Sequence, residues 1–449
     1  MTPVLAQQGL ALALGIPIVA LGVLAISMLI GHPPAERRVH QLVATAMTSS
    51  LILATGLLLY VLVTGQAVVV SLGTPIAVRG YHFDIVFAAD LAGSTYLWLD
   101  LLLCGLISAF SERYLHQEPG YHRFFVLMLA FAVGVAIIAV AGGLDLLFAG
   151  WEIVGLASAL LIAFFWERRA PVENGLRAFA TYRFTDLGLL LGIVALHQET
   201  GAASLESLGS LSASSALLVG GLLVFGAMGK GAIFPFTPWL PRAMEGPTPS
   251  SAIFYGALSI HASPFLLLRV HDVLEASPLL AAAVVALGLV TAAHASMVGR
   301  VQTDIKSALG YASVAQVGLI WIWIGLGFTH LALAHIVGHA ILRTWQLLRS
   351  PSLFLERRAI VFALADHPGK TGWFFELVIP AVARRSLYRL ALERWYLEAF
   401  WSGTIRVLTA PLRVVDRLDR RWAAVFEPAP TTEDAPAALP AEGVEVHGR

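Results

Sequence analysis

Long apolar runs recur along this chain at lengths that suit membrane-crossing helices. About 20 consecutive apolar residues cross the hydrocarbon core of a bilayer as a helix. Eleven stretches meet this criterion: 10–30, 43–64, 91–111, 124–142, 145–165, 178–196, 214–236, 250–269, 278–298, 308–327 and 331–349. The first run is too long for the apolar core of a signal peptide and follows no basic segment, so it predicts a true span. The pattern predicts an all-α membrane protein, a polytopic bundle of about 11 transmembrane helices.

Basic residues gather in alternate connections between these runs. One set of connections contains Arg37, Arg38, Arg113, Arg123, Arg168, Arg169, Arg242, Arg300 and Lys306. The connections near 65–90 and 197–213 contain Asp84, Glu199 and Glu206, with Arg79 as their one basic residue. Because basic loops stay in the cytoplasm, we expect a multi-pass protein of the bacterial inner membrane with a periplasmic N-terminus.

The last hundred residues differ in character from the apolar runs. Residues 351–370 read as a mixed linker, and residues 372–425 are apolar but charged every few positions. That pattern is typical of amphipathic helices that lie on a membrane or on a partner protein. The tail from Glu427 is rich in Pro, Ala and Glu, which is typical of disorder. We therefore divide the chain into N-terminal helices (1–90), a core of transmembrane helices (91–350), a linker with amphipathic helices (351–426) and a disordered tail (427–449).

Composition agrees with a membrane protein and excludes several other classes. Of the 449 residues, 57% are hydrophobic and 13% are charged, whereas soluble domains carry about 25% charged residues. Lys plus Arg and Asp plus Glu balance at 29 each, so there is no basic excess for binding nucleic acid. The single cysteine, Cys104, excludes disulfides and cysteine-ligated clusters within the chain. We expect no catalytic residue, no metal site and no cofactor in this chain, with membrane lipid as its surroundings.

Several ionisable residues fall inside the predicted spans. Glu152 lies in the fifth, Arg183 and Asp186 in the sixth, and Lys230 in the seventh. A charge at mid-bilayer costs about 2.5–3.5 kcal/mol on insertion scales, which makes each residue a functional candidate. Arg183 and Asp186 stand three residues apart, a spacing that fits a structural ion pair as well as a pathway. Glycines beside Lys230 and three prolines after it predict a discontinuous helix, as occurs where backbone lines a cavity.

A polar stripe is predicted on the last span. His335, His339 and Arg343 recur every four residues and therefore share one helix face. Two histidines at this spacing also fit a zinc site, but no carboxylate or cysteine stands nearby in sequence. A proton relay is favoured, because neutral imidazole is cheap to bury and titrates near physiological pH. Lys306 is a further pathway candidate, or else a basic anchor of a cytoplasmic loop.

Six strings between residues 90 and 340 resemble the largest antiporter-like subunit of respiratory complex I and related subunits of multisubunit sodium/proton antiporters. They are GYHRFF, FAGWEIVGLASALLI, YRFTDLG, MGKGAIFPFTPWLPRAMEGPTPSSA, VQTDIKSALGYASVAQVG and HIVGHA. The resemblance implies a proton or cation pathway through Glu152, Lys230, Lys306, His335 and His339. Arg183, Asp186, Tyr255, His261 and Arg343 would support it.

The sequence departs from that family at three points. The family's eighth-span histidine falls on Tyr255, although His261 lies further along the same span. Arg343 stands where complex I has a lysine, and arginine holds a charge without shuttling a proton. The family's later spans, with a second broken helix, have no counterpart here.

The string HAILRTWQLLRSPSLF and the arginine-rich ending resemble the DabB membrane subunits of two-component inorganic carbon accumulation systems. This resemblance implies a DabA-like partner, a large zinc protein similar to β-type carbonic anhydrases, and places the zinc in that partner. Entry of H⁺ or Na⁺ through this chain would then drive CO₂ hydration to bicarbonate. Alternatives are a proton-pumping subunit of a complex I-like NADH-quinone oxidoreductase or membrane hydrogenase, and a Na⁺/H⁺ antiporter subunit.

Overall fold

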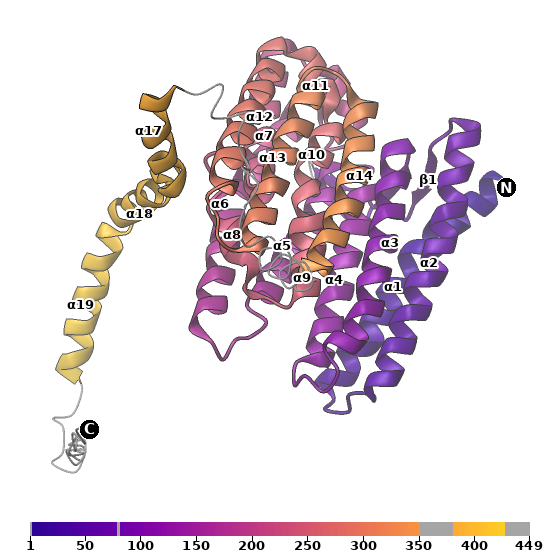
Figure 1. Ribbon diagram of the computed structural model, residues 1–449. Helices are drawn as coiled ribbons and strands as arrows, with labels where there is room; N and C mark the ends of the chain where they lie inside the picture. Colours follow the sequence, from indigo (N-terminus) through magenta and orange to yellow (C-terminus); the bar gives the residue numbers. More distant parts are fainter. Residues whose placement is uncertain (1, 79–80, 351–379, 427–449) are drawn as a thin grey trace, which may run out of the picture. The chain divides into compact units, whose positions relative to one another are not determined.

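The computed structural model describes residues 2–78, 81–350 and 380–426 (Figure 1). The chain divides into two compact units, Met1–Trp395 and Tyr396–Arg449. Long helices make up most of the first unit and run side by side (Figure 1). The predicted linker at 351–370 and the predicted tail from 427 lie outside the described residues.

The N-terminal part consists of three long helices and a small β-structure. The helices are α1 (Pro3–Leu29), α2 (Glu36–Thr64) and α3 (Leu91–Tyr114). Between α2 and α3, strand β1 (Val68–Ser71) pairs with β4 (Val86–Ala89), and β2 (Ile76–Val78) pairs with β3 (Tyr81–Phe83), both antiparallel. The predicted connection at 65–90 thus contains two short antiparallel ribbons, whose strands are rich in β-branched and aromatic residues.

The core of the first unit continues with four long helices. These are α4 (Tyr121–Val140), α5 (Leu144–Ile162), α6 (Arg169–Thr200) and α7 (Ala213–Lys230), with the short 3₁₀ helix η1 (Glu206–Ser210) before α7. The chain after Lys230 is non-helical as far as α8 (Trp239–Arg242). The predicted break after Lys230 is therefore confirmed.

The eighth span is also irregular. After η2 (Ala243–Glu245) it is assembled from α9 (Thr248–Ser251), the π-helical segment η3 (Ala252–Ala257) and α10 (Ser259–Arg269). The remaining helices of the core are α11 (His271–Ala276), α12 (Pro278–Gly299), α13 (Ile305–Gly325) and α14 (Thr329–Leu348). Pro264, inside α10, has no N–H to donate, so this span cannot form a complete helical hydrogen-bond ladder.

Ten helical segments among the described residues are long and apolar enough to cross a membrane. The polytopic helical class predicted from the sequence is confirmed. The predicted eleventh span, 331–349, corresponds to α14, which is helical but is not one of the ten. Its polar stripe of His335, His339 and Arg343 lowers its apolar character.

Glycines allow close contact within three helix pairs. A methyl group on Gly134 of α4 would come within 3.0 Å of the carbonyl oxygen of Gly150 on α5. One on Gly188 of α6 would reach the Leu222 carbonyl of α7 at 2.7 Å, and one on Gly288 of α12 the Gly318 carbonyl of α13 at 2.6 Å. Close packing of backbones through small residues is the usual means by which membrane helices associate.

The C-terminal helices bear out the predicted amphipathic character. The first unit includes α17 (Ala381–Leu392) and most of the turn η4 (Arg394–Tyr396). The second unit contains α18 (Leu397–Leu408) and α19 (Ala410–Phe426). On α19, Arg413, Arg417 and Arg420 alternate with the exposed apolar residues Val414 and Leu418. A helix of this kind needs lipid or a partner to cover its apolar side.

Candidate functional site

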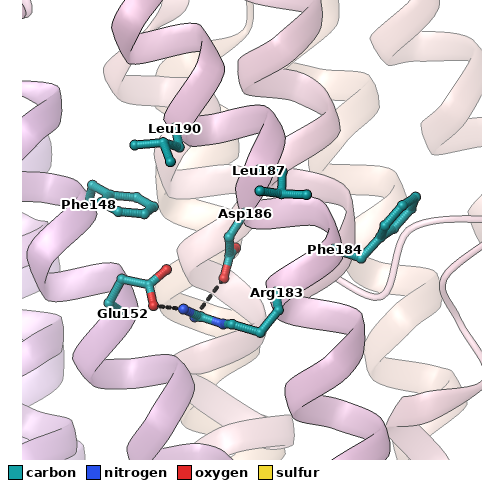
Figure 2. Close-up of a pocket in the computed structure, with 7 residues that line it drawn as sticks. All are labelled: Phe148, Glu152, Arg183, Phe184, Asp186, Leu187 and Leu190. Atoms are coloured by element: carbon teal, nitrogen blue, oxygen red, sulfur yellow. Dashed lines mark hydrogen bonds and ion pairs between the residues drawn. The ribbon is translucent and has the colours of Figure 1, made fainter. Parts of the chain in front are cut away.

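Four charged side chains from α5, α6 and α7 meet within the first unit, and we call them the charge cluster: Glu152, Arg183, Asp186 and Lys230. Arg183 lies between the two carboxylates (Figure 2). One of its terminal nitrogens pairs with Glu152 Oε2 and the other donates to Asp186 Oδ2 at 2.9 Å. Arg183 and Asp186 thus form the ion pair that their spacing allowed, and the pairing of Arg183 with Glu152 was not foreseen.

Trp151 joins the carboxylate side of the cluster to Lys230. Its indole nitrogen donates to Asp186 Oδ1 at 2.6 Å, while its backbone oxygen accepts from Lys230 Nζ at 3.1 Å. The ammonium nitrogen also lies 4.7 Å and 4.6 Å from the ring centres of Trp151 and Tyr182. A cation at these distances over two ring faces is attracted by their quadrupoles. These contacts stabilise a fully buried ammonium group that would otherwise be costly to dehydrate.

Close glycine contacts make room for the cluster. A methyl group on Gly155 would lie 2.9 Å from Lys230 Nζ, and one on Gly229 would lie 2.0 Å from Thr185 Oγ1. The glycine before Lys230 therefore lets α7 pack directly against α6, and Gly155 lets the ammonium group reach α5. The glycines in this part of the sequence predicted a helix break, and the structure adds this packing role.

A groove between α5 and α6 leads to the cluster. It has a volume of about 450 Å³ and is lined by Phe148, Glu152, Arg183, Phe184, Asp186, Leu187 and Leu190 (Figure 2). Phe184 and Leu187 are about half exposed, so the groove opens on the outer side of α6. Glu152 and Arg183 retain 26% and 36% side-chain exposure, whereas Asp186 and Lys230 are buried. The charge cluster therefore has an accessible end, the Glu152–Arg183 ion pair, and a buried end, the ammonium group of Lys230.

A second polar cluster, the histidine cluster, comprises His261, His335, His339 and Arg343. His261 Nε2 and His339 Nδ1 are 2.9 Å apart, and Arg343 Nε lies 3.5 Å from His339 Nε2. His335 Nε2 lies 2.9 Å from Gln316 Oε1 of α13. The predicted stripe on α14 is thus joined by His261 from α10. The side chain of Tyr255 lies outside the described residues.

The partners of the histidine cluster fix the direction of its hydrogen bonds. His261 Nδ1 lies against the carbonyl oxygen of Ala257, which can only accept, so this nitrogen carries a proton. With His261 neutral, its Nε2 must accept from His339 Nδ1, and His339 Nε2 must accept from Arg343. The result is a chain of neutral imidazoles that all donate in one direction, away from Arg343. His261 and His339 can exchange a proton between their facing nitrogens, while the Ala257 carbonyl and Arg343, which do not relay protons, end the chain.

The two clusters are neighbours through α10. A methyl group on Gly231, directly after Lys230, would lie 2.3 Å from Ser263 Oγ. Ser263 stands two residues after His261 on α10 and accepts from Trp321 Nε1 at 3.2 Å. Lys306, in contrast, lies half-buried in the first turn of α13. Within the described ranges it makes no hydrogen bond or ion pair, so the structure does not join it to either cluster.

Asp100 of α3 is a buried carboxylate that the sequence reasoning missed. It is fully buried, and Cys104 Sγ donates to its Oδ1 at 3.2 Å. The rule that identified Glu152, an ionisable residue within an apolar span, also applies to LWLDLLLCGL and would have found it. In the part of the chain that the structure describes, no three His, Cys, Asp or Glu side chains are grouped to hold a metal ion.

These features define the class of protein, which is a polytopic helical membrane protein with a broken helix and two buried polar clusters. Residues 141–360 match the family described as NADH:quinone oxidoreductase/Mrp antiporter, TM. The resemblance to antiporter-like subunits is therefore confirmed at the level of this family over that segment, which includes both clusters.

Curated proteins with similar sequences point to the same family. The chain is 30% identical over 346 residues to NAD(P)H-quinone oxidoreductase chain 5 of Synechocystis sp., a match covering 74% of this chain and 51% of the relative. It is 32% identical over 311 residues to NADH-ubiquinone oxidoreductase chain 5 of Pongo abelii, covering 69% and 51%. The chain thus spans about half the length of these curated relatives.

Two solved structures share the fold. A chain of the Mrp complex from Dietzia sp. DQ12-45-1b aligns with a TM-score of 0.63 and 25% identity over 76% of this chain and 37% of that one. A chain of the archaeal membrane-bound sulfane sulfur reductase aligns with a TM-score of 0.65 over 76% of this chain and 70% of that one. At 18% identity, the second structural match supports a shared fold only.

Proposed function

We propose that this chain is an ion-conducting membrane subunit in which the charge cluster and the histidine cluster form successive parts of one pathway. The observation that carries the proposal is the network from Glu152 through Arg183, Asp186 and Trp151 to Lys230, where α7 breaks. A fold that needed only stability would place apolar residues at these positions, because a buried ion pair is seldom more stable than a hydrophobic replacement.

The charges of the cluster suggest how an ion would move through it. Two carboxylates and two cations sum to zero. A proton that enters the groove and binds Glu152 removes one negative charge, and Arg183 is then held by Asp186 alone. The cluster now has an excess positive charge, which favours release of a proton from Lys230 towards the helix break. Binding at one end is thus linked to release at the other through electrostatics.

The histidine cluster provides the continuation of the pathway. A proton leaving the region of Lys230 meets α10, where Ser263 packs on Gly231. His261 stands two residues before Ser263 on α10, on a different face of that helix, and its imidazole lies 2.9 Å from His339. Arg343 keeps a fixed positive charge beside His339, which prevents a second proton from remaining there. We assign Lys306 to the later part of the pathway on the resemblance alone.

We further propose that the subunit belongs to an inorganic carbon pump of the DabA/DabB kind in a bacterial inner membrane. The motif resemblance and the amphipathic helices α17 to α19 support this reading, since such helices can dock a soluble partner at a membrane surface. The partner would be a DabA-like zinc protein that carries out CO₂ hydration. One charge crossing about 100 mV releases about 2.3 kcal/mol, and a tenfold bicarbonate gradient costs about 1.4 kcal/mol.

The relatives favour a second candidate function. Curated relatives include chain or subunit 5 of quinone oxidoreductases, which supports an alternative role as the proton-pumping subunit of a redox-driven complex. The Mrp complex in turn supports a Na⁺/H⁺ antiporter subunit. All three candidates require the same two clusters and differ in the partner.

A growth experiment separates the candidates. A carbonic-anhydrase-deficient bacterium is given this chain, a DabA-like zinc protein encoded beside it, or both, and is grown in ordinary air. We expect growth only with both proteins, and loss of bicarbonate accumulation when an uncoupler is added. Growth with this chain alone would contradict the two-component function. Failure of the pair, with both proteins present and associated, would favour the redox-driven pump.

A further inference from the structure

A third polar contact lies on the other side of the helix break, on α12. Thr291 Oγ1 accepts from the backbone N–H of Phe234 at 3.0 Å, and His294 Nε2 lies 2.9 Å from Thr237 Oγ1. Both partners belong to the non-helical segment that follows Lys230. Thr291 and His294 stand three residues apart, so they share one face of α12. This helix therefore contacts the segment with two side chains, one of which can titrate.

His294 is unusual for its position. It is fully buried, and it is the one ionisable residue in the 22 residues of α12. Aromatic rings flank the imidazole, with centroid distances of 5.8 Å to Phe234 and 6.3 Å to Tyr311 of α13. Its Nδ1 is buried and has no hydrogen-bond partner among the described residues. A buried nitrogen left without a partner calls for an explanation.

Holding the broken segment in place does not account for this arrangement. Thr291 already performs that task with a hydroxyl that cannot titrate, and it also donates to the Leu287 carbonyl at 2.7 Å. An amide or hydroxyl side chain at position 294 would bond Thr237 equally well. Imidazole adds one property that those groups lack, a second nitrogen that can gain a proton while the first gives one up.

We propose that His294 is a further proton-transfer residue, which links the helix break after Lys230 to the α12–α13 side of the core. A proton binds the open Nδ1, and the imidazolium formed donates its Nε2 proton to Thr237 Oγ1. The Thr237 hydroxyl passes its own proton to water at the break, so the imidazole returns to neutrality with its proton on Nδ1. Three protons have each moved by one position: one onto Nδ1, one from Nε2 to the hydroxyl, and one from the hydroxyl to water, so His294 and Thr237 are both neutral afterwards.

This inference rests on the proposed ion-conducting function and specifies its ion at this point. A single imidazole and a hydroxyl between aromatic rings can exchange H⁺, but they lack the set of oxygen ligands that a hard cation requires. At His294 the transported species is therefore H⁺ rather than Na⁺.

The test uses the full chain with its partner, reconstituted in liposomes under an imposed potential, with dyes that report internal pH and Na⁺. His294→Gln retains a group that can bond Thr237 but cannot relay a proton, and we expect H⁺ flux to fall at least tenfold. Thr291→Val is the matched control, because it removes the neighbouring bond to the same segment and no titratable group. We expect it to retain flux.

Small molecules separate a relay from a structural role. His294→Ala leaves a cavity, and imidazole added to the medium should restore flux. Pyrazole has the same size and the same hydrogen-bonding atoms but scarcely accepts a second proton, so it should not. Rescue by both compounds, equal loss in His294→Gln and Thr291→Val, or full flux in His294→Gln would each overturn the role of His294. A wild-type complex that carries no ion would instead overturn the proposed function.

Discussion

Replacing Lys230 by methionine tests whether the four charges of the charge cluster balance one another. Methionine keeps the length of the side chain and removes the ammonium group. The variant loses one charged hydrogen bond to the Trp151 carbonyl and two contacts with aromatic ring faces. It leaves Glu152 and Asp186 with Arg183 as their single cation, so the cluster has an excess negative charge.

The expected magnitude follows from these contacts. The charged hydrogen bond contributes about 1.5–3 kcal/mol, and each ring contact contributes about 1–2 kcal/mol. Removing a buried ammonium group also removes a desolvation penalty of several kcal/mol, so these effects largely offset one another. The excess negative charge remains. At an effective dielectric constant of about 20, two unit charges about 6 Å apart interact by about 3 kcal/mol. We therefore expect Lys230→Met to destabilise the protein mainly through Asp186.

A double-mutant cycle measures this coupling. Asp186→Asn neutralises the unbalanced carboxylate, so Lys230→Met/Asp186→Asn should be more stable than the two single changes predict, by about 1–3 kcal/mol. The measurement is thermal unfolding of purified protein in one detergent, combined with ion flux in liposomes, which should be lost whenever Lys230 is absent. Lys306→Met with Asp186→Asn is the control cycle, since Lys306 lies outside the cluster, and its coupling should be close to zero. Strict additivity in the Lys230 cycle would refute the charge-balance reasoning.

Three further predictions follow from the other contacts. Gly229→Ala should lower thermal stability by about 1–3 kcal/mol because the new methyl group meets Thr185 at 2.0 Å, whereas Gly221→Ala, with nothing within 4 Å, should not; equal effects would show that α6 and α7 do not pack as described. Arg343→Lys should conduct better than Arg343→Ala in flux assays, because a fixed charge beside His339 is what the pathway needs, and equal loss would point instead to bonding that only guanidinium provides. Reporter fusions at Arg38, Arg169 and Arg300 should read cytoplasmic and one near Ser210 periplasmic, and the opposite pattern would invert the orientation.

The class of the protein and most of its polar candidates could be predicted from the amino-acid sequence. Runs of about 20 apolar residues admit few structures other than membrane helices, because backbone groups in a bilayer must bond within their own segment. Glu152, Asp186 and Lys230 could also be identified from the sequence, because ionisable residues are conspicuous within apolar spans. Glycines and prolines around Lys230 also predicted the break, because they act on the local backbone. The four short strands before α3 were not predicted, because segments of three or four residues are too short to show a strand pattern beside long apolar runs.

Which of these candidates contact one another depends on how the helices pack. Spacing along α6 suggested that Arg183 pairs with Asp186, but the second bond of Arg183, to Glu152, depends on how α5 packs against α6. His261 joins His339 from a different helix, while Lys306 remains apart from both clusters within the described residues. Trp151 and Gln316 gave no charge signal in the sequence, and their roles arise from partners 35 and 19 residues away. His294 is ionisable and lies within a predicted span, but its partner Thr237, 57 residues away, is shown only by the structure. Periodicity reports which face of a helix a residue occupies, whereas the element that this face contacts is fixed only by packing of the whole chain.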